Sequence, residues 1–155
     1  MKETTVERLV GRIEAAWADF TASYAGLSDA QLVAPGATGD WSIKDVLAHV
    51  TIWEEEALKH LPLILQGGRP PRYADVYGGI DAFNLQMVAQ RRELSLAAVR
   101  EQQATTHRRL IEFVRSLPAD QLTATSRARR RLRLDTYGHY PLHTELIRVW
   151  RRQLG

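Results

Sequence analysis

The 155-residue sequence contains no cysteine. Disulfide bonds, thiolate nucleophiles and sulfur-ligated zinc are therefore excluded, and a reducing compartment is allowed but not required. The chain also lacks any apolar run approaching the roughly 18 residues that cross a bilayer. Its first residues, MKETTVERLV, have no apolar core of the kind found in signal peptides. We therefore expect a cytoplasmic protein with no membrane partner.

Composition places the chain among ordinary globular proteins. Hydrophobic residues make up 45% and charged residues 25%. The length suits one domain with its own core, spanning residues 1–155. The net charge is only +3, and much of the basic excess lies near the C-terminus, so its meaning is local.

Apolar residues recur at three- and four-residue spacing along most of the chain, which predicts an all-α protein. A first helix is expected over residues 4–26, and Ser42 with Asp45 forms a capping box that begins the second. Further helices are predicted over residues 80–92, from Ser95 to just before Pro118, and from a start between residues 137 and 140. Four principal helices among these predict a four-helix bundle in which residues 67–79 form a long connection. Residues 123–134 are the least regular, and the alternation in RLRL (131–134) is compatible with an extended segment.

Two histidines in the last helix are candidate metal ligands. His139 and His143 are four residues apart, a spacing that places both imidazoles on one helical face. Leu142, Leu146 and Trp150 are predicted to share this face, so we expect it to point inward.

His49, on the apolar edge of the second helix, is the candidate third ligand. If the second and last helices run parallel, the three imidazoles can meet at one level; if the helices are antiparallel, we expect that they cannot. Three neutral imidazoles suit Zn²⁺ or Ni²⁺ and leave a position open for water or substrate. The alternative is that each histidine is an ordinary helix residue without a metal. His60 and His107 are predicted to be structural or solvated.

Glu54, Glu55 and Glu56 form an acidic run of which at most one member should face a site. Glu56 lies nearest the side of His49 and is a candidate general base, although a solvated face is the commoner role for such a run. The arginines between residues 127 and 133 are interpreted as a solvated or ion-paired surface, because no aromatic residue or nucleic-acid motif accompanies them. We therefore predict no nucleic-acid partner.

One block of the second helix resembles a known family. The segment Trp41–Val50 (WSIKDVLAHV), followed by Trp53-Glu54, is similar to the second-helix signature of the DinB-like superfamily. The Phe83-Asn84 pair, Gly138-His139-Tyr140 and the C-terminal IRVW agree with it. The resemblance is greatest to the ClbS/DfsB family of four-helix-bundle proteins.

This resemblance implies a four-helix bundle with a long crossover, and a histidine triad at His49, His139 and His143. Some ClbS/DfsB members hydrolyse the cyclopropane of a genotoxin, whereas other DinB-like proteins use a metal and a small thiol. Three functions therefore stay open: a hydrolase of a small electrophile, a metal-dependent thiol transferase, and a non-catalytic ligand-binding protein. We expect Trp53, Asn84 and Tyr140 to wall a pocket for a small-molecule ligand, with Tyr140 and Glu56 as candidate catalytic residues. The oligomeric state stays open, a homodimer being one option.

Overall fold

The structure, a computed structural model, describes residues 4–155 and is all-helical, as predicted. In chain order the elements are α1 (Thr5–Ser23), α2 (Asp29–Val33), α3 (Ile43–Leu65), α4 (Tyr73–Tyr77), α5 (Ile80–Arg91), α6 (Leu96–Arg115), the 3₁₀ turn η1 (Ala119–Leu122), α7 (Arg127–Asp135) and α8 (Tyr140–Gln153).

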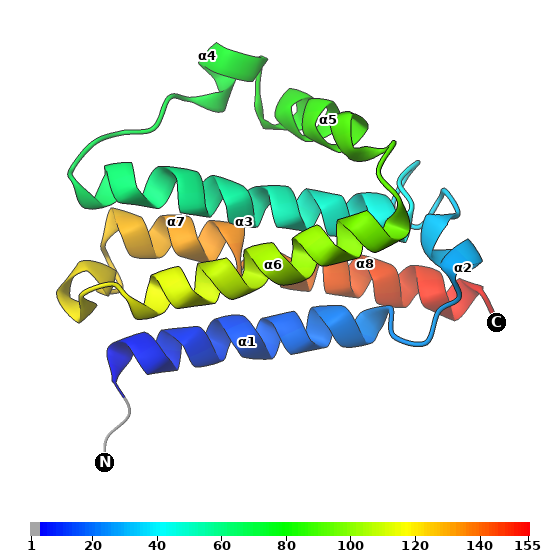
Figure 1. The fold of residues 1–155 in the computed structure, drawn as a ribbon, viewed down its shortest axis with the longest axis horizontal. Coiled ribbons are helices and arrows are strands. Elements are labelled where there is room, and N and C mark those ends of the chain that lie inside the picture. Colours follow the sequence, from blue (N-terminus) through cyan, green and yellow to red (C-terminus); the bar gives the residue numbers. More distant parts are fainter. Residues whose placement is uncertain (1–3) are drawn as a thin grey trace.

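Four long rods form the bundle (Figure 1). Three are the single helices α1, α3 and α6, and the fourth is built from two shorter helices, α7 and α8, placed nearly end to end. α3 and α6 run in the same direction, whereas α1 and the α7–α8 rod run in the opposite direction. A chain that passes between two parallel helices must return along the whole bundle, so the predicted long crossover between α3 and α6 is confirmed.

The crossover carries α4 and α5, which lie outside the four rods above α3 (Figure 1). It packs on α3 through a small apolar cluster separate from the main core, made of Ile52, Trp53, Phe83 and Val88. The long connection predicted over residues 67–79 therefore contains one short helix, α4, and lies over the face of α3 that carries Trp53.

The helix starts follow the predicted caps. The Ser42 hydroxyl accepts the backbone N–H of Asp45, and the Asp45 carboxylate accepts the N–H of Ser42. Ser28 and Ser95 cap α2 and α6 in the same way through their hydroxyls. Each cap satisfies amide donors that the first turn of a helix leaves free.

The extended segment considered for residues 131–134 is wrong: these residues belong to α7. Ser126 caps this helix by accepting the N–H of Arg129. Leu132 is fully buried, and Arg131 pairs with Asp135 one turn later at 2.6 Å. The alternation of arginine and leucine thus reflects one buried leucine beside paired and exposed neighbours on a helix, not the two faces of a strand.

The inward face predicted for α8 is also partly wrong. His143 is buried, but Leu142 is 62% exposed and Leu146 is 45% exposed. The buried side consists of Tyr140, His143, Thr144 and Ile147. The helix begins at Tyr140, within the predicted range, and the insertion of this ring into the core fixes the rotation of the helix.

Residues 4–155 contain no helix whose length and apolar content would let it span a bilayer.

Candidate metal centre and adjoining cavity

Three histidines from two ends of the sequence meet in the middle of the bundle. His49 lies on the second turn of α3, His139 is the residue just before α8, and His143 lies on the first turn of α8. The sequence led us to expect that the imidazoles could meet only if the second and last helices run parallel, but α3 and α8 run antiparallel (Figure 1). The side chains still meet because α8 begins halfway along the bundle, where α7 ends, so its first turn lies beside the early turns of α3.

The three imidazoles converge through their Nε2 atoms. His139 Nε2 lies 3.1 Å from His49 Nε2 and 2.9 Å from His143 Nε2. One ligand nitrogen from each residue can be chosen so that all three lie within 4.8 Å of one another. Nitrogens bound to one ion at about 2.0–2.1 Å lie roughly 3 Å apart when the bonds are near right angles. The two short separations therefore suit two shared edges of one coordination sphere.

All three imidazoles are held neutral. Burial, with the two neighbouring histidines, lowers the pKa of His49 to about 2. Burial, with His143, lowers the pKa of His139 to about 3, and burial alone lowers the pKa of His143 to about 4. A neutral imidazole keeps the lone pair that a metal requires, so no proton has to be displaced at neutral pH.

The outer nitrogens have no comparable support. Nδ1 of each of the three histidines is buried without a hydrogen-bond partner among residues 4–155. Metal-binding histidines usually donate this N–H to an acceptor that orients the ring. Here aromatic neighbours hold two of the rings: Trp41 lies 5.0 Å from His49, and Trp53 lies 6.3 Å from His139, between ring centroids. The donor set is thus three neutral nitrogens, which fits Zn²⁺ or Ni²⁺.

A cavity of about 270 Å³ opens beside the cluster. His49 and His139 form part of its wall, so the histidine nitrogens are reached from this side. Its remaining lining residues are Trp53, Tyr73, Ile80, Asn84, Arg131, Leu134 and Asp135. Trp53 and Asn84 thus lie where the sequence predicted pocket residues. The volume falls just below the roughly 300–1,000 Å³ of common ligand pockets, so the space suits a compact molecule.

A chain of polar contacts forms one wall of the cavity. Arg131 donates to the Asp135 carboxylate at 2.6 Å and to the Tyr73 hydroxyl at 2.6 Å. Tyr73 in turn donates to Glu56 at 3.0 Å. His60 lies 3.4 Å from the same Glu56 oxygen. This chain ties α4 of the crossover to α3 and α7, and it places Glu56 behind Tyr73, not on the cavity surface.

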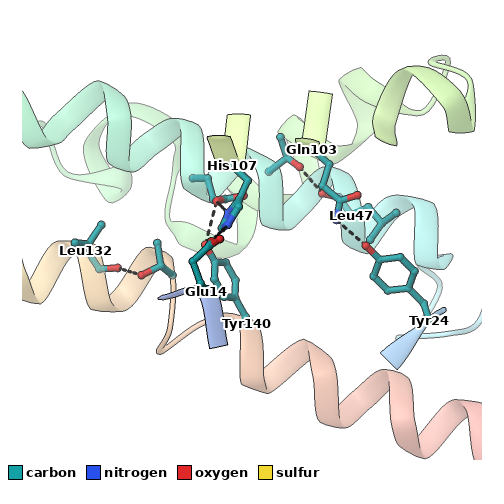
Figure 2. Close-up of polar contacts among 10 residues, drawn as sticks. Glu14, Tyr24, Leu47, Gln103, His107, Leu132 and Tyr140 are labelled. Atoms are coloured by element: carbon teal, nitrogen blue, oxygen red, sulfur yellow. Dashed lines mark hydrogen bonds and ion pairs between the residues drawn. The ribbon is translucent and has the colours of Figure 1, made fainter. Parts of the chain in front are cut away.

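Tyr140 does not line the cavity. Its ring is fully buried, and its hydroxyl donates to Glu54 Oε2 at 3.0 Å. His107 Nδ1 donates to the same oxygen at 2.7 Å, while its Nε2 contacts Glu14 (Figure 2). Burial lowers the pKa of His107, but Glu54 and Glu14 outweigh this effect, so the pKa lies above its ordinary value. Tyr140 therefore anchors the start of α8 to the core.

The acidic run is more buried than expected. Glu54 is fully buried and Glu56 is 8% exposed, whereas Glu55 pairs with Arg91. None of the three carboxylates lines the cavity, so the expectation that at most one faces a site is not contradicted. Two of them are buried because α3 is covered on several sides, by α6, α7 and the crossover (Figure 1). Side chains that leave such a central helix in different directions, like those of Glu54 and Glu56, can both be buried.

Sequence reasoning missed three residues of the polar wall: Tyr73, Arg131 and Asp135. Tyr73 lies in a segment predicted as a loop, and nothing in the sequence marked it as a pocket residue. Arg131 and Asp135 could have been recognised from their spacing, because residues 131, 135, 139 and 143 are each four positions apart. Within α7 this spacing places Arg131 and Asp135 on one face, and both line the cavity together with His139.

A sequence model of the DinB superfamily matches residues 12–145 of this chain. No curated protein matches the chain.

Two of the solved structures that match this chain illustrate the shared fold. One, titled "Sibling Lethal Factor Precursor - DfsB", superposes with a TM-score of 0.78 at 17% identity, over 99% of this chain and 98% of the other. The second, an uncharacterised protein from Escherichia coli UTI89, gives a TM-score of 0.75 at 13% identity, over 99% and 95% of the two chains. At these identities the likeness concerns the fold alone.

Proposed function

Because this chain belongs to the DinB superfamily, we propose that His49, His139 and His143 hold a zinc or nickel ion and that the protein hydrolyses a small electrophilic molecule. The observation that carries the proposal is the convergence of three neutral imidazoles, two buried and that of His139 half-buried, beside a compact cavity. Such an ion, when bound, acts as a Lewis acid and lowers the pKa of a water in its open position to about 7.

The residues of the chain supply the rest of the reaction. Trp53, Ile80 and Leu134 give the cavity an apolar wall that takes up the body of the substrate and displaces bulk water. Hydrolysis joins the oxygen of a water molecule to the electrophilic carbon, while the bonding electrons and a proton go to the leaving atom. Of the two candidate catalytic residues, Glu56 is the one connected to the cavity, through the Tyr73 hydroxyl. Tyr140 has its hydroxyl committed to Glu54, and we assign it a positioning role.

The thiol-transferase alternative receives less support. An anionic thiol would need a free cation in the cavity, and Arg131 is the cationic side chain among the described residues that line it. That guanidinium is paired with Asp135 and bonded to Tyr73. The remaining alternative, sequestration without chemistry, predicts that ligand binding survives loss of the histidines.

Turnover of model electrophiles tests the proposal. We would incubate zinc- and nickel-loaded protein with neutral lactones, epoxides and activated cyclopropanes and detect addition of one water by mass spectrometry. The expected result is turnover in the wild type that is lost in His139→Ala and reduced at least tenfold in Glu56→Gln, which should still bind the ion. The control Glu112→Gln, on the exposed side of α6, should keep full turnover. Equal turnover in wild type and His139→Ala would overturn the proposal.

A further inference from the structure

The side chain of Asn84 presents a hydrogen-bond donor at the cavity wall, outside the histidine cluster. Trp53 Nε1 donates to Asn84 Oδ1 at 2.8 Å. An indole N–H can only donate, so this bond fixes which end of the Asn84 amide is oxygen and which is nitrogen. The Asn84 amide nitrogen then keeps two hydrogens that have no partner among residues 4–155.

The side chains of Arg131, Asp135 and Tyr73, which also line the cavity, contact one another. Asp135 accepts from Arg131, and Tyr73 both accepts from Arg131 and donates to Glu56. Arg131 and Asp135 lie 2.6 Å apart, so neither group stands alone in the cavity. The protein therefore offers a ligand neither an unpaired cation nor an unpaired carboxylate in the cavity, within the part of the chain that the structure describes.

A free donor beside apolar walls favours one kind of ligand. A ligand that displaces water from the Asn84 amide must replace the hydrogen bond that the water made, so a ligand oxygen that accepts from this amide binds better than an apolar group. A charged ligand would lose its hydration without gaining a free counter-charge from the protein.

We propose that Asn84 is the anchoring donor for the substrate, and that the substrate is an uncharged, largely apolar molecule carrying a carbonyl-type oxygen that accepts from the Asn84 amide. This deepens the proposed hydrolase and rests on it for the reaction, whereas the anchoring contact itself involves only Trp53 and Asn84. The compact molecule then lies between Asn84 on α5 and the histidines that begin α8, against the ring of Trp53. Trp53 is the positioning residue that turns the amide toward the ligand.

Two probes of nearly the same shape isolate the hydrogen bond. Cyclohexanone has the acceptor oxygen, and methylenecyclohexane has a CH₂ group in its place. We would titrate each into metal-free, chelator-dialysed protein and follow the Trp53 indole N–H by ¹H–¹⁵N NMR. Wild type should bind cyclohexanone about tenfold more tightly than methylenecyclohexane, the size of one net hydrogen bond. Cyclohexanecarboxylate should not bind.

Three variants complete the test. Asn84→Asp keeps the acceptor for Trp53 but loses both donors, so the tenfold preference for the ketone should disappear; Asn84→Ala should abolish it as well. Gln90→Glu, the same amide-to-acid change at an exposed position of α5, should leave it intact.

An equal affinity of wild type for both probes, or a ketone preference that survives in both Asn84 variants, would overturn the inference. Because the titration is done without metal, its outcome is independent of whether the histidines bind an ion. Failure of the anchoring contact and failure of the metal centre are thus separate results.

Discussion

His139 Nε2 lies 3.1 Å from His49 Nε2, although the two residues are 90 positions apart and belong to antiparallel helices. Both imidazoles, like that of His143, have a pKa far below the ordinary value because they are buried. In mildly acidic solution the unfolded chain therefore binds protons at these three histidines, whereas the folded, metal-free protein does not.

This difference in proton uptake predicts a pH dependence of stability. Above a pH of about 6.5 neither state is protonated at these sites, and the histidines contribute no difference. As the pH falls from about 6.5 to about 4, the unfolded state alone takes up protons, so the free energy of unfolding should fall by up to about 1.4 kcal/mol per histidine per pH unit. Urea unfolding of metal-free protein at several pH values measures this slope. His49→Gln should make it shallower by the share of one histidine; an identical slope in the variant would contradict the prediction.

The turn before α8 has no room for a side chain at Gly138. A Cβ there would lie 2.7 Å from the Arg133 carbonyl oxygen, which also accepts the Gly138 N–H. Gly138→Ala should therefore displace the backbone that carries His139, lower the free energy of unfolding by about 1–3 kcal/mol and weaken metal binding. Chemical denaturation and zinc titration measure the two effects.

Gly11 provides the matched control for that substitution. It lies on an exposed face of α1, with no atom within 4 Å of an added Cβ. Gly11→Ala should stabilise the protein by about 0.4–1 kcal/mol, because alanine favours the helix. If the two alanine variants behaved alike, the turn would not constrain the metal centre as we describe.

Removal of the Tyr140 hydroxyl should destabilise the core. Glu54 is fully buried, and its Oε1 has no partner among residues 4–155. Tyr140→Phe takes a donor from Oε2, so we expect a loss of about 1–3 kcal/mol in the free energy of unfolding. Tyr137→Phe, which removes a contact with Arg129 at the half-buried surface, should cost less than about 1 kcal/mol. A larger effect at Tyr137 than at Tyr140 would refute the anchoring role.

The pair of Arg131 and Asp135 predicts a different pH response. Burial raises the pKa of Asp135 to about 7, and Arg131 opposes this rise. Arg131→Met should raise that pKa further, because it leaves a buried carboxyl without its cation. A carboxyl with a raised folded pKa favours the folded state at low pH and loses that contribution as pH rises. The deficit of Arg131→Met relative to wild type should therefore grow as the pH rises above about 7, where the wild-type carboxyl has lost its proton and that of the variant has not; thermal unfolding at each pH measures it. A deficit that shrinks over this range would contradict the account.

Local patterns predicted most of the helices, and His49, His139 and His143 were singled out as residues that would meet. The caps at Ser42 and Ser95 depend on neighbouring residues only, so the sequence was sufficient to place them. The break between α7 and α8 was not predictable in this way, because the arginine-rich segment has little apolar periodicity of its own. α7, which contains this segment, is stabilised by contacts with residues distant in the sequence, such as the contact of Arg131 with Tyr73.

Burial of polar residues was the hardest feature to predict. The sequence made Glu54 look like part of a solvated face and His107 look like an isolated residue. They are partners because α3 and α6 lie side by side, which no local pattern specifies. The same tertiary dependence turned Tyr140 from an expected pocket wall into a core residue and shifted the exposed stripe of α8 by one residue.

The central claim is that the three histidines bind one divalent ion, and the metal content of the protein tests it most directly. We would purify the chain without an affinity tag, load it with zinc or nickel, remove weakly bound ions by gel filtration and measure metal by elemental analysis. The account predicts one ion per chain in the wild type and in a His60→Gln control, and loss of the ion in His49→Ala, His139→Ala and His143→Ala. A wild type that retains no ion under any loading condition, or a His139→Ala variant that retains it fully, would contradict the account.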